Sequence, residues 1–219
     1  MTSARVIPLF PLSSLLVPGL VLPLHVFEPR YRSLLEDLSA LPEDERGFGV
    51  VAIREGHEVG SDGVRALYDV GTFASLREVT TLEDGRSDIM TVGAGRFRLL
   101  SLVPGKPYLQ AEVEWLAEES GDDADDLARS AREAFDDYRG LLSDDAEPDE
   151  LPDDPRVVSY LITAALVAEL GERQALLEAG SDAERLRAGT RILRRETAII
   201  SEVPSLPAVD MAREAYGLN

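Results

Sequence analysis

Few side chains in this sequence could bind a metal ion or transfer a proton at neutral pH. The chain has two histidines, His25 and His57, and Glu28 lies close to the first of them. These three residues could supply metal ligands, but a zinc site needs three or four converging ligands, usually at compact spacing. We therefore expect His25 to be partly buried and bonded locally, His57 to be exposed, and no metal or cofactor to be bound.

The sequence lacks a well-placed nucleophile. It contains no cysteine, and its single lysine, Lys106, lies between Gly105 and Pro107 in an expected surface turn. A Ser–Lys pair needs a desolvated amine held against the hydroxyl, which such a turn does not provide. The 41 acidic residues make chance carboxylate pairs unavoidable, so no acid–base pair is assigned. The sequence predicts no catalytic residue and no enzyme, and a hydrolase using carboxylates alone is kept as an alternative.

The composition and the missing motifs argue against several classes of ligand and partner. A net charge of −19 disfavours nucleic acid and anionic membranes, because both are bound largely through Lys and Arg. No G-x-x-x-x-G-K-[ST] loop is present, so we expect ATP neither to bind nor to be hydrolysed. The apolar stretch 6–27 is interrupted by four prolines and fits neither a spanning helix nor a signal peptide. Together with the absence of cysteine, this predicts a cytoplasmic protein.

The elements that would position a site divide near residue 119. In the first part, two apolar runs flank the turn Pro18-Gly19, and a helix is expected over about 29–41. Short β-branched segments follow, separated by turns such as Asp84-Gly85. The expected strands are 48–54, 68–74, 76–82, 88–92, 96–103 and 109–115. Strands of this length and spacing are typical of a barrel or sandwich, so the fold class is α+β with residues 1–119 forming a β-rich part.

Residues 120–219 are expected to form a helical bundle. Two acidic segments, 118–126 and 143–154, should be solvated connections and the first sites of proteolysis. An apolar stripe runs from Leu127 to Leu142, and Asp154-Pro155 opens a second helix that is expected to reach Leu170. A short helix ends near Gly180, and the last long helix ends at Pro204. Ser181 with Glu184 predicts a capping box for that last helix.

Several of these segments together resemble a known family. The motifs IPLFPL (7–12) and LVPGLVLPLHVFEPRYR (16–32) resemble the start of the Lon protease N-terminal, substrate-binding domain. The resemblance is especially close to stand-alone bacterial relatives that lack the ATPase and protease modules. It continues in family order through 48–51, 70–72, 93–99, 107–113 and 172–196, and so covers about residues 5–203.

The resemblance implies a non-catalytic binding module: a PUA-like pseudobarrel plus a helical bundle that binds unfolded or exposed polypeptide segments. A protease or chaperone is the partner protein it suggests. The likeness to PUA domains also keeps a nucleic-acid-associated role as an alternative. We expect an apolar groove or sheet edge for the peptide. Leu16 and Val17 are expected either to be exposed on the Pro18-Gly19 turn or to belong to the core. The candidate peptide-binding residues are Leu15, Leu16, Val17, Phe27 and Tyr31.

Overall fold

The computed structural model describes residues 4–58, 64–142 and 151–202. The chain divides into two compact units, Met1–Ala117 with Glu169–Glu178 and Glu118–Ala168 with Ala179–Asn219. The sequence placed a single boundary near residue 119 and assigned every later helix to the second part. The segment Glu169–Glu178 departs from this prediction, because its helix is hydrogen-bonded to the strands of the first unit.

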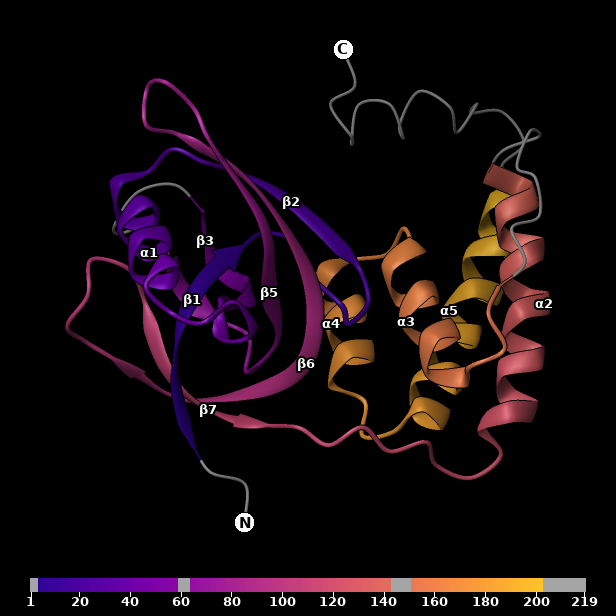
Figure 1. Ribbon diagram of the computed structural model, residues 1–219. Coiled ribbons are helices and arrows are strands. Elements are labelled where there is room, and N and C mark those ends of the chain that lie inside the picture. The colour runs from indigo at the N-terminus through magenta and orange to yellow at the C-terminus, as the bar shows by residue number, and fades with distance from the viewer. Residues whose placement is uncertain (1–3, 59–63, 143–150, 203–219) are drawn as a thin grey trace. The chain divides into compact units, whose positions relative to one another are not determined.

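The first unit holds all the described strands and two α-helices (Figure 1). Its elements are β1 (Arg5–Leu12), β2 (Val21–Val26), α1 (Pro29–Ser39), the short 3₁₀ helix η1 (Glu43–Glu45), β3 (Gly47–Gly56), β4 (Val64–Leu67), β5 (Val70–Thr81), β6 (Ser87–Val103), β7 (Gln110–Trp115) and α4 (Leu170–Glu178).

The strands of this unit close into a barrel, as the sequence predicted. β1 runs parallel to β3, with Leu9 opposite Gly49, and antiparallel to β7, with Ile7 opposite Ala111. The antiparallel pairs β3–β5, β5–β6 and β6–β7 complete the ring. Register shifts within β5–β6 and β6–β7 let these long strands bend around the core. β2 lies outside the ring and pairs with the first part of β6.

The barrel strands are longer than the sequence indicated. The expected segments 68–74 and 76–82 are one strand, β5, and the segments 88–92 and 96–103 are both part of β6. The Gly93-Ala94-Gly95 stretch, which reads as a break in sequence, remains in β6 because Gly93 exchanges backbone hydrogen bonds with Gly19 and Leu20. A Cβ at Gly93 would collide with the carbonyl oxygen of Val17, so this close approach requires glycine.

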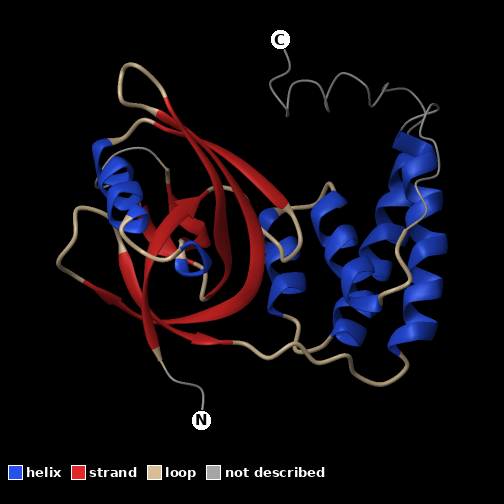
Figure 2. Ribbon diagram, in the orientation of Figure 1, coloured by secondary structure: helices blue, strands red, loops and turns tan. Residues whose placement is uncertain are grey.

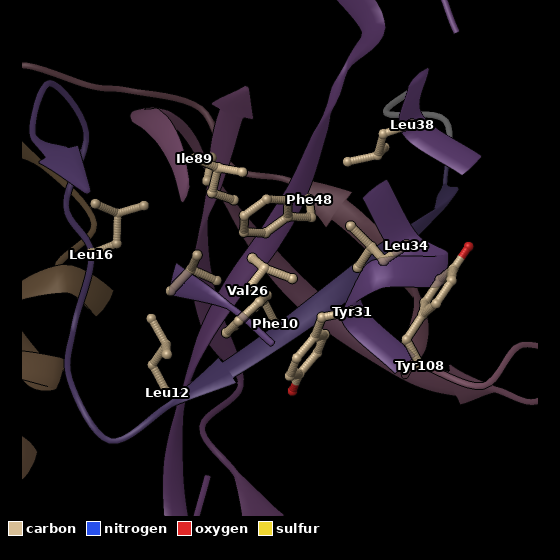
Figure 3. Close-up of a cluster of buried hydrophobic side chains, with 12 residues drawn as sticks. Phe10, Leu12, Leu16, Val26, Tyr31, Leu34, Leu38, Phe48, Ile89 and Tyr108 are labelled. Carbon is tan, nitrogen blue, oxygen red and sulfur yellow. The ribbon is translucent and has the colours of Figure 1, made fainter. Parts of the chain in front are cut away.

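The core of the barrel joins α1 to the strands. Tyr31, Leu34 and Leu38 of α1 are buried against a cluster of strand and loop side chains (Figure 3). That cluster comprises Phe10, Leu12, Leu16, Val26, Phe48, Val50, Ala74, Ile89 and Tyr108. The helix begins at Pro29, which suits the first helical position because its missing N–H would have no partner there. The predicted helix at about 29–41 is confirmed, with its end at Ser39.

The second unit is a bundle of α2 (Ala124–Leu142), α3 (Pro155–Ala165) and α5 (Asp182–Glu202), which pack against one another (Figure 2). The Asp154 side chain caps α3 by accepting from the backbone N–H groups of Arg156 and Val157. Ser181 Oγ accepts from the Glu184 N–H, as the capping box predicted, but Glu184 accepts from Gly180. The predicted helix end at Pro204 lies outside the described residues.

One expectation for this unit is wrong. α3 ends at Ala165 instead of Leu170, because Leu166 is extended and buried and the next N–H, of Val167, donates to the Tyr138 hydroxyl. Residues 119–123 of the acidic segment 118–126 are exposed, as expected for a solvated connection, and the Glu119 and Ser120 carbonyls also accept hydrogen bonds from the backbone N–H groups at the start of α5. Most of the other acidic segment, 143–150, lies outside the described residues.

Candidate functional site

The clearest hollow that contains predicted site residues lies in the first unit, where β1 and β2 end and α1 begins. It has a volume of about 120 Å³ and an apolar floor with carboxylates at its edge. Its lining residues are Phe10, Pro11, Leu12, Leu24, His25, Phe27, Glu28, Tyr31 and Glu58.

The local sequence explains how these side chains meet. β2 alternates, with Leu22 and Leu24 half-buried and Pro23 and His25 exposed, as expected for a strand that has one face on the core. After β2 ends, the chain turns into α1 through Phe27, whose side chain is 51% exposed. An exposed phenylalanine next to a hollow is the unusual feature here, because large aromatic side chains are normally buried.

Stacked aromatic rings form the floor of the hollow. The rings of Phe10 and Tyr31 stack with centroids 3.9 Å apart, and Phe48 packs against Phe10 at 5.5 Å. Burial raises the pKa of Tyr31 to about 12, so its hydroxyl stays protonated at neutral pH. Figure 3 shows this hydroxyl pointing away from the other side chains of the cluster, and no described residue bonds to it. Tyr31 therefore offers a hydrogen-bond donor to a ligand.

An arginine organises the charged edge of the hollow. Arg30 lies 3.0 Å from the Glu28 carboxylate, and its Nη2 donates to the Glu58 carbonyl oxygen at 2.9 Å. Its guanidinium also lies over the Tyr31 ring, 4.5 Å from the centroid. The Glu58 carboxylate accepts from the backbone N–H of Ser13, which joins the end of β3 to the loop after β1. These contacts hold the edge of the hollow in place without a bound ligand.

A second hollow of about 390 Å³ adjoins the first and shares Leu24 and His25 with it. It is lined by Ile89 and Met90 of β6 and by the carboxylates of Glu78 and Asp88, among others. His25 Nδ1 lies 2.6 Å from Asp88 Oδ1, so this histidine is bonded as expected, but the expectation that it is partly buried is wrong, because it lies on the exposed face of β2. The two hollows together follow β2, so the surface can accept a ligand longer than one side chain.

The structure separates the five predicted site residues. Phe27 and Tyr31 both line the first hollow, whereas Leu15 is half-buried and does not. Leu16 and Val17 are core residues, 4% and 0% exposed, so the exposed position considered for them is wrong. The reason is that the loop is bound to the barrel: buried Thr72 donates from Oγ1 to the Leu16 carbonyl oxygen at 2.7 Å.

Sequence reasoning missed the strand residues of this surface. Phe10, Leu12 and Leu24 follow the alternating pattern of β1 and β2, but that pattern does not reveal which side chains meet.

Among residues 4–58, 64–142 and 151–202 no group of three metal-ligating side chains is close enough to hold an ion. Lys106 is ion-paired with Asp37 at 2.9 Å, and His57 is exposed. No helix in the described part of the chain is both long and apolar enough to cross a bilayer.

Comparison with known proteins agrees with this architecture. The chain is 30% identical over 203 residues to a Lon protease of Anaeromyxobacter dehalogenans, covering 89% of this chain and 24% of that protein. It is also 30% identical over 188 residues to the Lon protease of Escherichia coli, covering 82% of this chain and 23% of that protein. The chain thus spans about a quarter of the length of the curated relatives it matches.

Two solved structures of Lon N-terminal domains have a fold similar to that of this chain. A Lon N-terminal domain protein from Xanthomonas campestris superposes with a TM-score of 0.60 at 26% identity, covering 84% of this chain and 95% of that one. The N-terminal domain of a Mycobacterium avium complex Lon protease shares the fold, with a TM-score of 0.64 at 17% identity and coverage of 87% and 98%. The family model of the ATP-dependent protease La (LON) substrate-binding domain matches residues 6–195, so the chain belongs to this family.

Proposed function

We propose that the chain is a non-catalytic recognition module that binds unfolded or exposed polypeptide segments in the hollows along β2. The observation that carries this proposal is the half-exposed Phe27 beside a hollow floored by stacked Phe10 and Tyr31. Membership of a family described as a substrate-binding domain supports it. An apolar or aromatic side chain of the bound segment would contact Phe27 and the floor, and Tyr31 would donate to a backbone carbonyl.

The position of β2 supports binding of an extended segment. Among the described residues β2 pairs with β6 alone, so its other edge carries no strand. Edge strands of this kind accept extended peptides through backbone hydrogen bonds, while side-chain pockets supply selectivity. Pro23 in the middle of β2 removes one donor, which limits such pairing to the residues on either side.

A partner would be needed to act on the bound segment. The binding surface contains no assigned nucleophile, so we propose that a protease or chaperone in the cytoplasm receives what the module binds. The first test is a pull-down from cell lysate with the full chain. Enrichment of unfolded proteins or of a protease supports the proposal. If no protein is enriched over the control even at high protein concentration, the result argues against it.

Binding to the hollow is tested directly with Phe27→Ala. Fluorescence anisotropy with a labelled, reduced and carboxymethylated α-lactalbumin measures affinity for an unfolded chain. Truncation of one half-exposed aromatic anchor should weaken binding by about fivefold or more, since the loss of such an anchor costs about 1 kcal/mol or more. The melting temperature should change little, because the side chain is not in the core.

The matched control is Leu102→Ala, which removes another side chain that is about half exposed, on β6 away from the hollow. It should leave affinity unchanged. If both variants bind as the parent does, or if both lose affinity equally, the hollow is not the binding site.

A further inference from the structure

A separate hollow lies in the helical unit, between α2 and α5. It has a volume of about 400 Å³ and is lined by Leu127, Ser130, Arg187, Thr190, Arg191 and Arg194. Its floor is formed by half-buried Leu127 and buried Thr190, while the three arginines are exposed. Every charged residue that lines it is therefore basic, in a chain that has 41 acidic and 22 basic residues.

The arginines form one stripe along α5. They are spaced i, i+4 and i+7, which places them on the same face of the helix over about 10 Å. Like charges at these spacings disfavour the helix, so the stripe does not serve the folding of α5. Its presence calls for another explanation.

The stripe is not neutralised by its neighbours. Arg187 donates to the backbone oxygen of Asp122 at 3.3 Å, and Arg194 donates to Ser130 Oγ at 3.2 Å. Within the described part of the chain none of the three has a carboxylate oxygen within 4.0 Å, and the guanidinium of Arg191 makes neither a hydrogen bond nor an ion pair. Glu133 and Asp137 line an adjacent hollow with Arg194 but do not pair with it.

Two other arginines of α5 are ion-paired with carboxylates. Arg185 is ion-paired with Asp182 at 3.0 Å and Arg195 with Glu196 at 2.7 Å. Arg185 and Arg195 are thus ion-paired, whereas the three arginines around the hollow have no carboxylate partner among the described residues. Guanidinium groups bind carboxylates through two parallel hydrogen bonds, and this geometry makes arginine the preferred residue for such recognition.

We propose that this hollow is a second binding site, which takes an acidic peptide segment in which carboxylate and aliphatic side chains alternate. In an extended peptide, side chains on one face recur every 6.6 to 6.8 Å or so, close to the roughly 6 Å rise between residues four apart on a helix. A segment that lies lengthwise between the two helices would turn its carboxylate face to the arginines of α5 and its aliphatic face to Leu127 of α2.

The apolar floor and the total charge favour a peptide over nucleic acid. A nucleic acid has no aliphatic group to place on Leu127, and its long run of phosphates would be repelled by the net charge of −19. A short peptide segment needs only a few carboxylates to pair with the arginines, so the negative charge of the chain repels it less than it repels a nucleic acid.

Anisotropy with a short labelled peptide of alternating Glu and Leu tests the proposal on the full chain. Arg191→Glu should weaken binding by at least about tenfold, because it replaces an attractive charge with a repulsive one. Arg54→Glu, an exposed arginine on β3 that makes the same change in net charge, should not weaken it. Arg191→Gln gives a milder second variant, and circular dichroism checks that each variant is folded.

The ligand class is tested in parallel. A peptide of alternating Gln and Leu should bind at least tenfold more weakly, and high salt should reduce the affinity of the Glu–Leu peptide. Equal binding of the two peptides, or full affinity in Arg191→Glu, would overturn the proposal. So would tighter, Arg191-dependent binding of single-stranded DNA, which would make this a nucleic-acid site. Phe27→Ala should leave Glu–Leu binding unchanged, so this site is judged independently of the hollow beside β2.

Discussion

The buried guanidinium of Arg96 donates from Nη1 to the carbonyl oxygen of Leu177 at 2.6 Å, although 81 residues separate them in the chain. Leu177 lies in the last turn of α4, where carbonyl groups have no partner within the helix and a cation is favoured by the helix dipole. Gln174 of the same helix donates to the Val70 carbonyl oxygen of β5 at 2.9 Å. These two side chains explain why α4 belongs to the barrel unit.

Replacing Arg96 with Met should lower the free energy of unfolding of the barrel unit by about 2 to 3 kcal/mol, since it removes charge-assisted hydrogen bonds and leaves the Leu177 carbonyl unsatisfied. Urea unfolding followed by Trp115 fluorescence measures this. Arg98→Met is the control, because Arg98 is exposed on the same strand and should change stability by less than about 0.5 kcal/mol. Similar losses in both variants would mean that the contact to α4 contributes nothing of its own.

Leu16→Ala should destabilise the barrel by about 2 to 5 kcal/mol, because it leaves a cavity in the core beside β6. A thermal melt distinguishes this from a surface role. Val21→Ala, at a position 58% exposed on β2, should melt near the parent temperature. An unchanged melting temperature for Leu16→Ala would show that the Leu16 side chain is exposed on this loop.

A buried charge network supports the helical unit. Asp182 accepts from Arg185 at 3.0 Å and from Arg156 at 3.3 Å, and both Asp182 and Arg185 are 1% exposed. Arg185→Met removes the cation closest to the buried Asp182 carboxylate, so it should lower the free energy of unfolding of the helical unit by about 3 to 5 kcal/mol. Arg191→Met on the same helix removes an exposed and unpaired arginine, and it should lower the free energy of unfolding much less. Chemical denaturation followed by circular dichroism compares the two.

Tyr31 predicts a limit to stability at high pH. Its pKa is raised by burial from about 10 in the unfolded chain to about 12 in the folded chain. The unfolded state therefore loses its proton first, so stability is full below about pH 10 and falls as the pH rises toward 12, by up to 2 to 3 kcal/mol or so.

Tyr31→Phe removes this titration. The variant should retain more stability than the parent at pH 11 or so and match it closely near neutrality, where the hydroxyl has no described partner. Denaturant midpoints at the two pH values provide the measurement. A parent and variant that lose stability equally with alkali would show that Tyr31 is not responsible.

Asp37 acts at the opposite end of the pH scale. Hydrogen bonds from Tyr108 and Lys106 lower the pKa of its carboxyl group. Its contribution to stability is therefore present above the unfolded pKa of about 4 and is lost as the pH falls through the lower folded value. Asp37→Asn should reduce the difference in stability between neutral and acid pH by only a small amount, because the pair is exposed to solvent.

The sequence by itself determined the parts of this protein that depend on local rules. Proline and glycine placed the turn at residues 18–19 and the start of α1, alternation identified β7, and helical spacing with caps identified α2 and α5. The linear order of family motifs was enough to indicate a barrel followed by a bundle. These features follow from backbone geometry and from patterns within one element.

Only the tertiary structure decided which residues meet. Leu16 and Val17 form an apolar pair beside a turn, and only the hydrogen bond from Thr72, 56 residues later, shows that the loop is buried. Phe27 belongs to the same motif and remains half exposed. Likewise, the pattern of α4 cannot reveal that Arg96 binds its last turn. Burial and pairing depend on contacts between distant segments, which the order of residues along one segment does not encode.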